Sequence, residues 1–167
     1  PDLVVERKSR RSYPHSNIAS QVIGFTNTDD SGLVGIERQF EEYLSGKDGW
    51  IVKQVNVAGR TGSFHKANYP KQDPDDGSNI QLTIDLEYQS ILQEELQRRI
   101  DESGAKGAMG VLMNPQNGDI LAMASLPDFD LNNPNMTPLE NQKNKVITDQ
   151  FEPGSTFKIV AATAALN

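Results

Sequence analysis

The alternation of apolar and polar residues in the second half of the chain predicts a strand, a helix and a hairpin, in that order. Residues 80–86 alternate with a period of two, which is typical of a strand. Asp85 can cap a following helix, and Gly104 can end it. The apolar runs 109–113 and 120–124 are joined by a turn containing Asn-Gly, a strong signal for a hairpin. The helix face expected to be buried consists of Tyr88, Ile91, Leu92, Leu96 and Ile100.

The first half of the chain is less regular, and its pattern predicts shorter elements. Residues 21–25 have the pattern of a short buried strand, and residues 35–44 carry apolar side chains at helical spacing. Residues 50–57 alternate loosely, as a strand does. Residues 58–79 have no periodic pattern and are rich in Gly and Pro. We therefore expect a domain boundary around residues 71–78.

The composition of the chain argues against several classes of function. The 167 residues include 16 basic and 23 acidic side chains, and the net charge of −7 would repel the phosphates of a nucleic acid. The chain has no cysteine, which excludes disulfides, thiol catalysis and cysteine-bound metal. Its two histidines have no ligand-like spacing, so neither a metal nor another cofactor is expected. No apolar stretch reaches the length of about 18 residues that a membrane span needs.

One motif in the chain can carry chemistry, a serine followed three residues later by a lysine. On a helix these positions share a face, so the amine can take the proton of the hydroxyl and make it a nucleophile. Lysine serves as this base only if burial or nearby cations lower its pKa. The chain contains three such pairs, Ser63–Lys66, Ser103–Lys106 and Ser155–Lys158.

The surrounding residues favour Ser155–Lys158 over the other two pairs. Ser63 lies in a Gly-rich stretch without helical pattern, and Ser103 directly precedes the helix terminator Gly104. Ser155 opens a run that is apolar almost all round, which predicts a buried helix with Lys158 in its first turn. The amides at a helix start would favour negative charge at Ser155. The alternative interpretation is that Ser155 only caps this helix.

Four blocks of sequence resemble the class B penicillin-binding proteins. Residues 152–158 (EPGSTFK) resemble their acylation motif, and residues 81–89 and 110–133 are similar to the opening elements of their transpeptidase domain. Residues 11–49 are similar to their pedestal, or dimerisation, domain. The blocks cover most of the chain in the order of the family. Their form is more similar to the cell-division type than to the elongation type.

The resemblance implies an α+β fold in two parts, an incomplete dimerisation domain at 1–78 and the N-terminal part of a transpeptidase domain at 79–167. It implies a D,D-transpeptidase that cross-links peptidoglycan stem peptides ending in D-Ala-D-Ala and is inhibited by β-lactams. Ser155 would be the nucleophile, with its backbone amide in the oxyanion hole, and Lys158 the general base. Arg11 and Glu37 stand in R-x-Y-P and G-I-E, where the family has a structural ion pair.

The resemblance also implies what surrounds the chain in the cell. The protein would be the extracytoplasmic part of a bacterial membrane protein, anchored by an N-terminal helix outside this sequence. Its partners would be the remainder of the transpeptidase domain and membrane proteins of the divisome or elongasome. The Ser-x-Asn and Lys-Thr/Ser-Gly motifs of the family do not occur at the expected place after Ser155, so we expect this chain alone to be an inactive, internal piece of a longer protein.

Two other functions are compatible with the same residues. A β-lactam sensor or β-lactamase would share the acylation chemistry, but such proteins generally lack the dimerisation domain. A non-catalytic module that docks on other cell-wall or division proteins would use the dimerisation domain alone. The acceptor amine of the stem peptide is not specified by any motif in the chain.

Overall fold

The computed structural model of the chain describes residues 10–52 and 69–166. Helices and strands are segregated, and the strands of this part of the chain form two antiparallel two-stranded sheets, which confirms the α+β class. The helices are α1 (Ser20–Ile23), α2 (Gly35–Gln39), α3 (Glu41–Leu44), α4 (Leu86–Ser103), α5 (Leu139–Gln142), α6 (Lys145–Thr148) and α7 (Lys158–Leu166). The strands are β1 (Trp50–Ile51), β2 (Lys71–Gln72), β3 (Ala108–Met113) and β4 (Ile120–Leu126), and the 3-10 turns are η1 (Pro134–Met136) and η2 (Gly154–Phe157).

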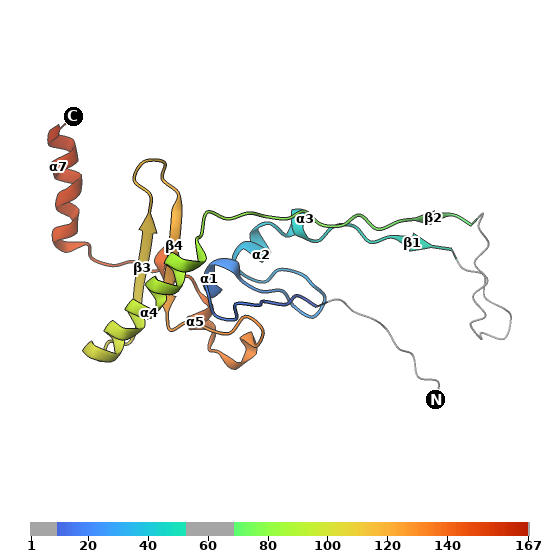
Figure 1. The fold of residues 1–167 in the computed structure, drawn as a ribbon, viewed down its shortest axis with the longest axis horizontal. Helices are drawn as coiled ribbons and strands as arrows, with labels where there is room; N and C mark the ends of the chain where they lie inside the picture. Colours follow the sequence, from blue (N-terminus) through green and yellow to red (C-terminus); the bar gives the residue numbers. More distant parts are fainter. Residues whose placement is uncertain (1–9, 53–68, 167) are drawn as a thin grey trace.

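The helix α4 and the hairpin β3–β4 follow the sequence-based expectation. One carboxylate oxygen of Asp85 accepts hydrogen bonds from the first-turn amides of α4, and Gly104 ends the helix at φ +67°. The helix lies on one face of the hairpin (Figure 1), where Gly110 and two buried alanines of β4 let it approach closely. A Cβ built at Gly110 would lie 2.9 Å from a methyl group of Leu92. A side chain at this position would force the Leu92 side chain to shift.

Two expectations about the second half are wrong. Residues 80–85 form no strand, although Asp85 N–H donates to the carbonyl of Leu121 and the Thr83 hydroxyl donates to that of Ile120. The expected buried face of α4 is wrong in part: Leu92, Leu96 and Ile100 are partly buried, whereas Tyr88 and Ile91 are about half exposed. The fully buried positions of the helix are Gln89 and Gln93, which are saturated with hydrogen bonds to other parts of the chain.

The first half differs from its expected strands and helices. Residues 21–25 do not form a strand, because the chain makes the single turn α1 and then bends at Gly24, whose φ is +76°. A Cβ at Gly24 would lie 1.9 Å from the carbonyl oxygen of Val34, so the two segments touch through their backbones. The helix expected over 35–44 is divided into α2 and α3 at Phe40. The strand expected over 50–57 begins as β1, and its positions after residue 52 lie outside the described residues.

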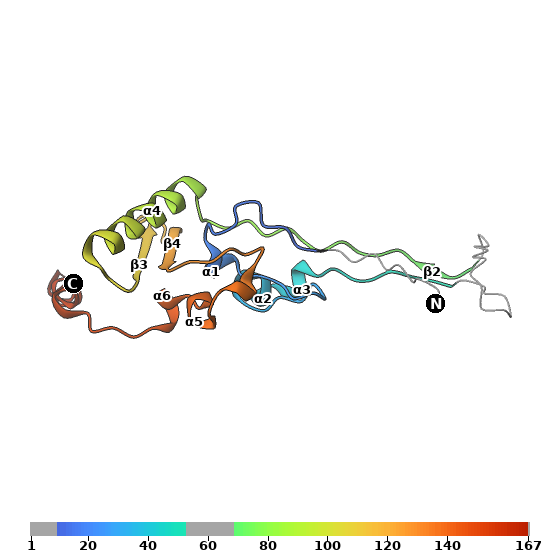
Figure 2. The same ribbon diagram turned by 90° about the horizontal axis from the view of Figure 1, so that it is seen from below.

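The core joins the two halves of the chain. Phe25 and Phe129 meet edge to face with ring centroids 5.9 Å apart, and Leu131 completes the buried cluster. Tyr13, Ile23 and Val34 pack against it. From this core the ribbon β1–β2 extends away as a long arm, and α7 lies apart at the opposite end (Figures 1 and 2). None of the helices in the described ranges is both long and apolar enough to cross a membrane.

Candidate functional site

Ser155 and Lys158 lie together at the start of the last helix. Gly154, at φ +53°, turns the chain into η2, and η2 continues directly into α7 with Lys158 as its first residue. In a 3-10 turn, side chains three residues apart stand above one another. The hydroxyl of Ser155 and the amine of Lys158 therefore belong to the same face of one turn. This is the arrangement in which an amine can take a proton from a hydroxyl.

The environment of this turn differs from the expectation of a buried helix. Every residue from 151 to 166 is exposed, including Phe157 and Ile159. The expectation of burial followed from the apolar character of α7, and burial needs a surface to pack against. Among the residues described, α7 contacts chiefly the turn η2 that precedes it. The buried surroundings expected for Lys158 are not provided by this part of the chain.

The other two serine–lysine pairs have different positions. Ser103 is the last residue of α4, and its hydroxyl donates to the carbonyl of Arg99 at 2.6 Å and accepts from Ala105 N–H. This hydroxyl forms hydrogen bonds with backbone groups at the end of a helix, which is a common structural role of serine. The pair Ser63–Lys66 lies outside the described residues.

Arg11 and Glu37 form a two-pronged ion pair between the N-terminal segment and α2. Arg11 Nε donates to one carboxylate oxygen at 3.0 Å, and a second guanidinium nitrogen donates to the other oxygen at 3.2 Å. The Tyr13 hydroxyl donates to Glu37 and accepts from the amide of Thr26. The side chain of Glu37 is only 9% exposed, whereas that of Arg11 is 42% exposed. The pair thus fixes the course of the N-terminal segment over α2.

The pKa values of Arg11 and Tyr13 in this cluster are both raised in the folded protein. The hydrogen bond to Glu37 raises the pKa of Arg11 above its usual value. Burial raises the pKa of the Tyr13 hydroxyl, and the nearby carboxylate of Glu37 adds to the effect. A group whose pKa is raised in the folded state stabilises the fold at pH values below its unfolded pKa, which is about 10 for tyrosine. This stabilisation is lost as the pH rises through the folded pKa. The cluster therefore stays intact at neutral pH and weakens in strongly alkaline solution.

We expect the two single substitutions in this pair to have unequal effects. Arg11→Ala should lower the free energy of unfolding by about 2–3 kcal/mol, because it leaves a nearly buried carboxylate without its cation. Glu37→Ala should cost about 1 kcal/mol, since the exposed guanidinium can turn to water. Urea unfolding followed by circular dichroism measures both, with the exposed neighbour Arg38→Ala as control. An equal cost for the two variants, or a greater cost for Glu37→Ala, would contradict this account.

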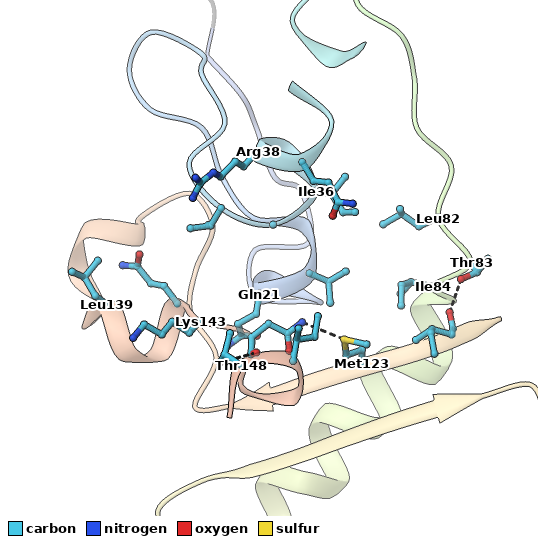
Figure 3. A pocket seen from close by; sticks show the side chains of 18 residues that line it. Gln21, Ile36, Arg38, Leu82, Thr83, Ile84, Met123, Leu139, Lys143 and Thr148 are labelled. Carbon is cyan, nitrogen blue, oxygen red and sulfur yellow. Dashed lines mark hydrogen bonds between the residues drawn. The ribbon is translucent and has the colours of Figure 1, made fainter. Parts of the chain in front are cut away.

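A cavity in the described part of the chain lies away from Ser155. It has a volume of about 700 Å³ and opens between α1, α2, β4 and the short helices α5 and α6 (Figure 3). Most of its wall is apolar, with Val22, Ile36, Leu82 and Ile147 among the lining side chains, and neither Ser155 nor Lys158 reaches it. The described residues contain no cluster of His, Cys, Asp and Glu that could hold a metal ion.

Sequence reasoning missed a group of three buried amides, Gln21, Gln89 and Gln93, which we call the amide cluster. Each of these side chains is at most 7% exposed, and each makes hydrogen bonds to residues far away in the sequence. The one sequence feature that could have indicated these buried amides is the spacing of Gln89 and Gln93, which lie four residues apart on one helix face. A polar pair at that spacing is ordinarily solvated, so the pattern alone favours exposure.

The chain matches two families of known protein domains, one in each half. Residues 1–82 match the family described as Penicillin-binding Protein dimerisation domain, and residues 108–167 match the Penicillin binding protein transpeptidase domain. The chain is 34% identical over 166 residues to the peptidoglycan D,D-transpeptidase FtsI of Escherichia coli K12, covering 99% of the chain and 28% of that protein. It is 35% identical over 163 residues to the stage V sporulation protein D of Bacillus subtilis, covering 97% of the chain and 25% of that protein.

A solved structure agrees with these matches. The apo form of penicillin-binding protein 3 from Mycobacterium tuberculosis superposes with a TM-score of 0.69 at 30% sequence identity. The superposition covers 93% of this chain and 31% of that protein. The chain therefore spans about a quarter to a third of the length of the proteins that it matches.

Proposed function

Because the chain belongs to the class B penicillin-binding protein family, as dimerisation-domain residues followed by the start of a transpeptidase domain, we propose that its protein is a serine D,D-transpeptidase that cross-links peptidoglycan. The observation that carries the proposal is the placement of Ser155 and Lys158 on one face of a turn within the residues that match the transpeptidase family. We assign residues 1–78 to the dimerisation domain and residues 79–167 to the transpeptidase domain.

The reaction uses the hydroxyl and the amine of this turn. Lys158 Nζ accepts the proton of Ser155 Oγ while that oxygen attacks the carbonyl carbon between the two terminal D-alanines of a stem peptide. The bond to the last D-alanine breaks as Lys158 returns the proton to the leaving nitrogen, so this residue leaves as the free amino acid and an ester to Ser155 remains. An amine of a neighbouring stem peptide then attacks the ester and gives up a proton through Lys158 to Ser155 Oγ, which is released. The Ser155 backbone amide donates to the developing oxyanion at the start of the helix.

Inhibition and cellular setting follow from the same chemistry. A β-lactam presents a strained amide in place of the D-Ala-D-Ala bond and leaves an ester on Ser155 that an acceptor amine does not resolve. The substrate lies outside the cytoplasm, so we place the protein at the outer side of the bacterial cell membrane. Its partners there are the remainder of the transpeptidase domain and membrane proteins of cell division or elongation. The match of the first half to a dimerisation domain favours this function over a β-lactamase or sensor.

A non-catalytic docking role is the second candidate, and it applies to the 167 residues taken alone. Their apolar helix α7 is exposed along its whole length, and an exposed apolar surface of this kind is suited to pack against another polypeptide. Acylation would also need the donors and carboxylate-binding groups that the family carries on later motifs. We therefore propose that these residues alone do not acylate.

Covalent labelling tests the proposed function. The whole protein, incubated with a fluorescent penicillin and digested, is expected to give one labelled peptide, the one that contains Ser155. Ser155→Ala should abolish the label, because it removes the hydroxyl three residues before Lys158. Ser103→Ala and Ser63→Ala serve as matched controls and should label like the unmodified protein. Label that persists in Ser155→Ala would overturn the assignment.

A further inference from the structure

Gln89 closes the free edge of strand β4 as a neighbouring strand would. Its side-chain amide nitrogen donates to the carbonyl of Met123 at 2.9 Å, and its carbonyl oxygen accepts from the Met123 amide at 2.8 Å. The second hydrogen of this nitrogen goes to the Gln93 carbonyl oxygen at 3.0 Å. The side chain is 0% exposed and uses every donor that it has. Helix α4 is thus attached to β4 by hydrogen bonds as well as by packing.

Gln93 extends this attachment to the dimerisation domain. Its carbonyl oxygen accepts from Ala19 N–H at 3.1 Å, in addition to the bond from Gln89. Its amide nitrogen donates to the carbonyl of Asn17 at 3.2 Å and to the carboxylate of Asp128 at 2.7 Å. One buried side chain therefore links the helix, the turn at residues 17–19 and the loop after β4.

The turn that Gln93 holds has an uncommon backbone. Ala19 has φ +53°, a left-handed conformation that a residue with a Cβ rarely adopts. Such a conformation persists only where surrounding contacts determine it, and the amide of Ala19 is one of the groups bonded to Gln93. The dimerisation-domain turn is therefore shaped by its contact with α4.

Gln21 holds together the two ends of the loop between β4 and α6. Its amide nitrogen lies 2.9 Å from the carbonyl oxygen of Ser125 and 3.0 Å from that of Asn141, with Pro127 O at 3.3 Å. Figure 3 shows this side chain among those that line the cavity. Ser125 lies in β4 and Asn141 in α5, so one amide bridges 16 positions of the chain.

The middle of the same loop is bonded to the dimerisation domain as well. Leu131 N–H donates to the carbonyl of Ser16 at 3.0 Å. The side chain of Asn132 accepts from Tyr13 N–H and donates to the Tyr13 carbonyl, as a paired strand would. The loop has little regular structure of its own, and long-range hydrogen bonds to residues 13–21 determine its course.

We propose that Gln21 and Gln93 are positioning residues for the acylation reaction. They hold the loop 127–142 on the dimerisation-domain turn, and this loop leads the chain from β4 to α6 and on to Ser155. Through this loop the dimerisation domain fixes the course of the chain as far as α6, from which an exposed segment continues to Ser155. The proposal rests on the proposed function of Ser155, and it assigns the dimerisation domain a part in catalysis through this contact.

The test uses the whole protein with Gln21→Met and Gln93→Met, which keep the length of the side chain and remove its hydrogen bonds. Gln97→Met is the matched control, because Gln97 lies one turn further along α4 and is exposed. Acylation by a fluorescent penicillin is followed over a range of concentrations, at a temperature where near-UV circular dichroism shows each variant folded. We expect the limiting acylation rate to fall at least about tenfold in both variants, since a misplacement of about 1 Å can cost a hundredfold. The apparent dissociation constant and the control should change less than about threefold.

Amide hydrogen exchange supplies a second readout that does not depend on activity. In the unmodified protein the amides of Ala19 and Leu131 should exchange as slowly as that of Met123, and in Gln93→Met the exchange at Ala19 should become faster. Folded variants that acylate at the normal limiting rate would overturn the proposal, as would rapid exchange at Ala19 or Leu131 in the unmodified protein. If the unmodified protein is not labelled at Ser155, the proposed function fails, and with it the catalytic role of the cluster. Slow exchange would then show that the attachment itself exists.

Discussion

Replacing Lys158 with alanine is expected to slow the acylation of Ser155 by penicillin by about 10²- to 10⁴-fold, the usual contribution of a general base. The hydroxyl of serine is a poor nucleophile, and in this turn Lys158 is the side chain three residues away on the same face. The fold of the described residues should be unaffected, because Lys158 is exposed in this structure. Stopped-flow measurement of labelling in the whole protein gives the rate.

Two further variants separate the role of a base from that of a positive charge. Lys158→Arg keeps the charge, but a guanidinium does not give up its proton near neutral pH, so this variant should be nearly as slow as Lys158→Ala. Lys106→Ala is the control, since it removes the lysine of the pair at Ser103, whose hydroxyl is occupied by a backbone carbonyl. Nearly normal rates in Lys158→Arg would show that the charge matters and that another group accepts the proton.

Gln89→Leu is expected to lower the free energy of unfolding by about 2–5 kcal/mol, a large loss for one nearly isosteric substitution. Leucine fills a similar volume, but it leaves the amide and the carbonyl of Met123 facing an apolar side chain. Each backbone group left unpaired inside a protein costs about 1–3 kcal/mol. The side-chain carbonyl of Gln93 loses the hydrogen bond from Gln89 at the same time. Urea unfolding of the purified protein, followed by circular dichroism, measures the loss.

The control for this substitution lies on the same helix. Gln97 is exposed, and its side-chain amide donates a hydrogen bond to the exposed carboxylate of Asp101. Gln97→Leu should therefore change the free energy of unfolding by less than about 0.5 kcal/mol. A cost below about 1 kcal/mol for Gln89→Leu would mean that the amide cluster contributes little to stability. Water entering at Met123 would then be the physical explanation.

Several elements were predictable because their signals are local. The carboxylate of Asp85 caps amides only two and three residues away, and the amide of Gly104 bonds to the carbonyl of Ile100 four residues before it. The hairpin β3–β4 likewise depends on a short turn rich in Asn and Gly and on apolar runs that flank it. Such interactions form within one stretch of chain, so the sequence of that stretch is sufficient to predict them.

The errors have the opposite origin. Residues 21–25 are apolar enough for a strand, yet Gln21 bonds to carbonyls more than 100 positions away, and those bonds require the turn α1. Helix α4 exposes Tyr88 and Ile91 and buries two glutamines, because the groups opposite these glutamines are the backbone of β4 and the turn at residues 17–19. Neither outcome is encoded in the spacing of apolar residues.

For the candidate site, the residues around the three serine–lysine pairs predicted which pair lies on a helical turn, since a long apolar run uninterrupted by glycine follows only Ser155–Lys158. The sequence by itself also determined the family, through motifs spread over the chain. Only the tertiary structure decided the surroundings: an exposed α7, the unequal burial of Arg11 and Glu37 within their ion pair, and a loop held by Gln21 and Gln93. The physical reason is that burial and pairing depend on which distant groups meet, and a hydrogen bond between residues 21 and 141 exists only once the chain has folded.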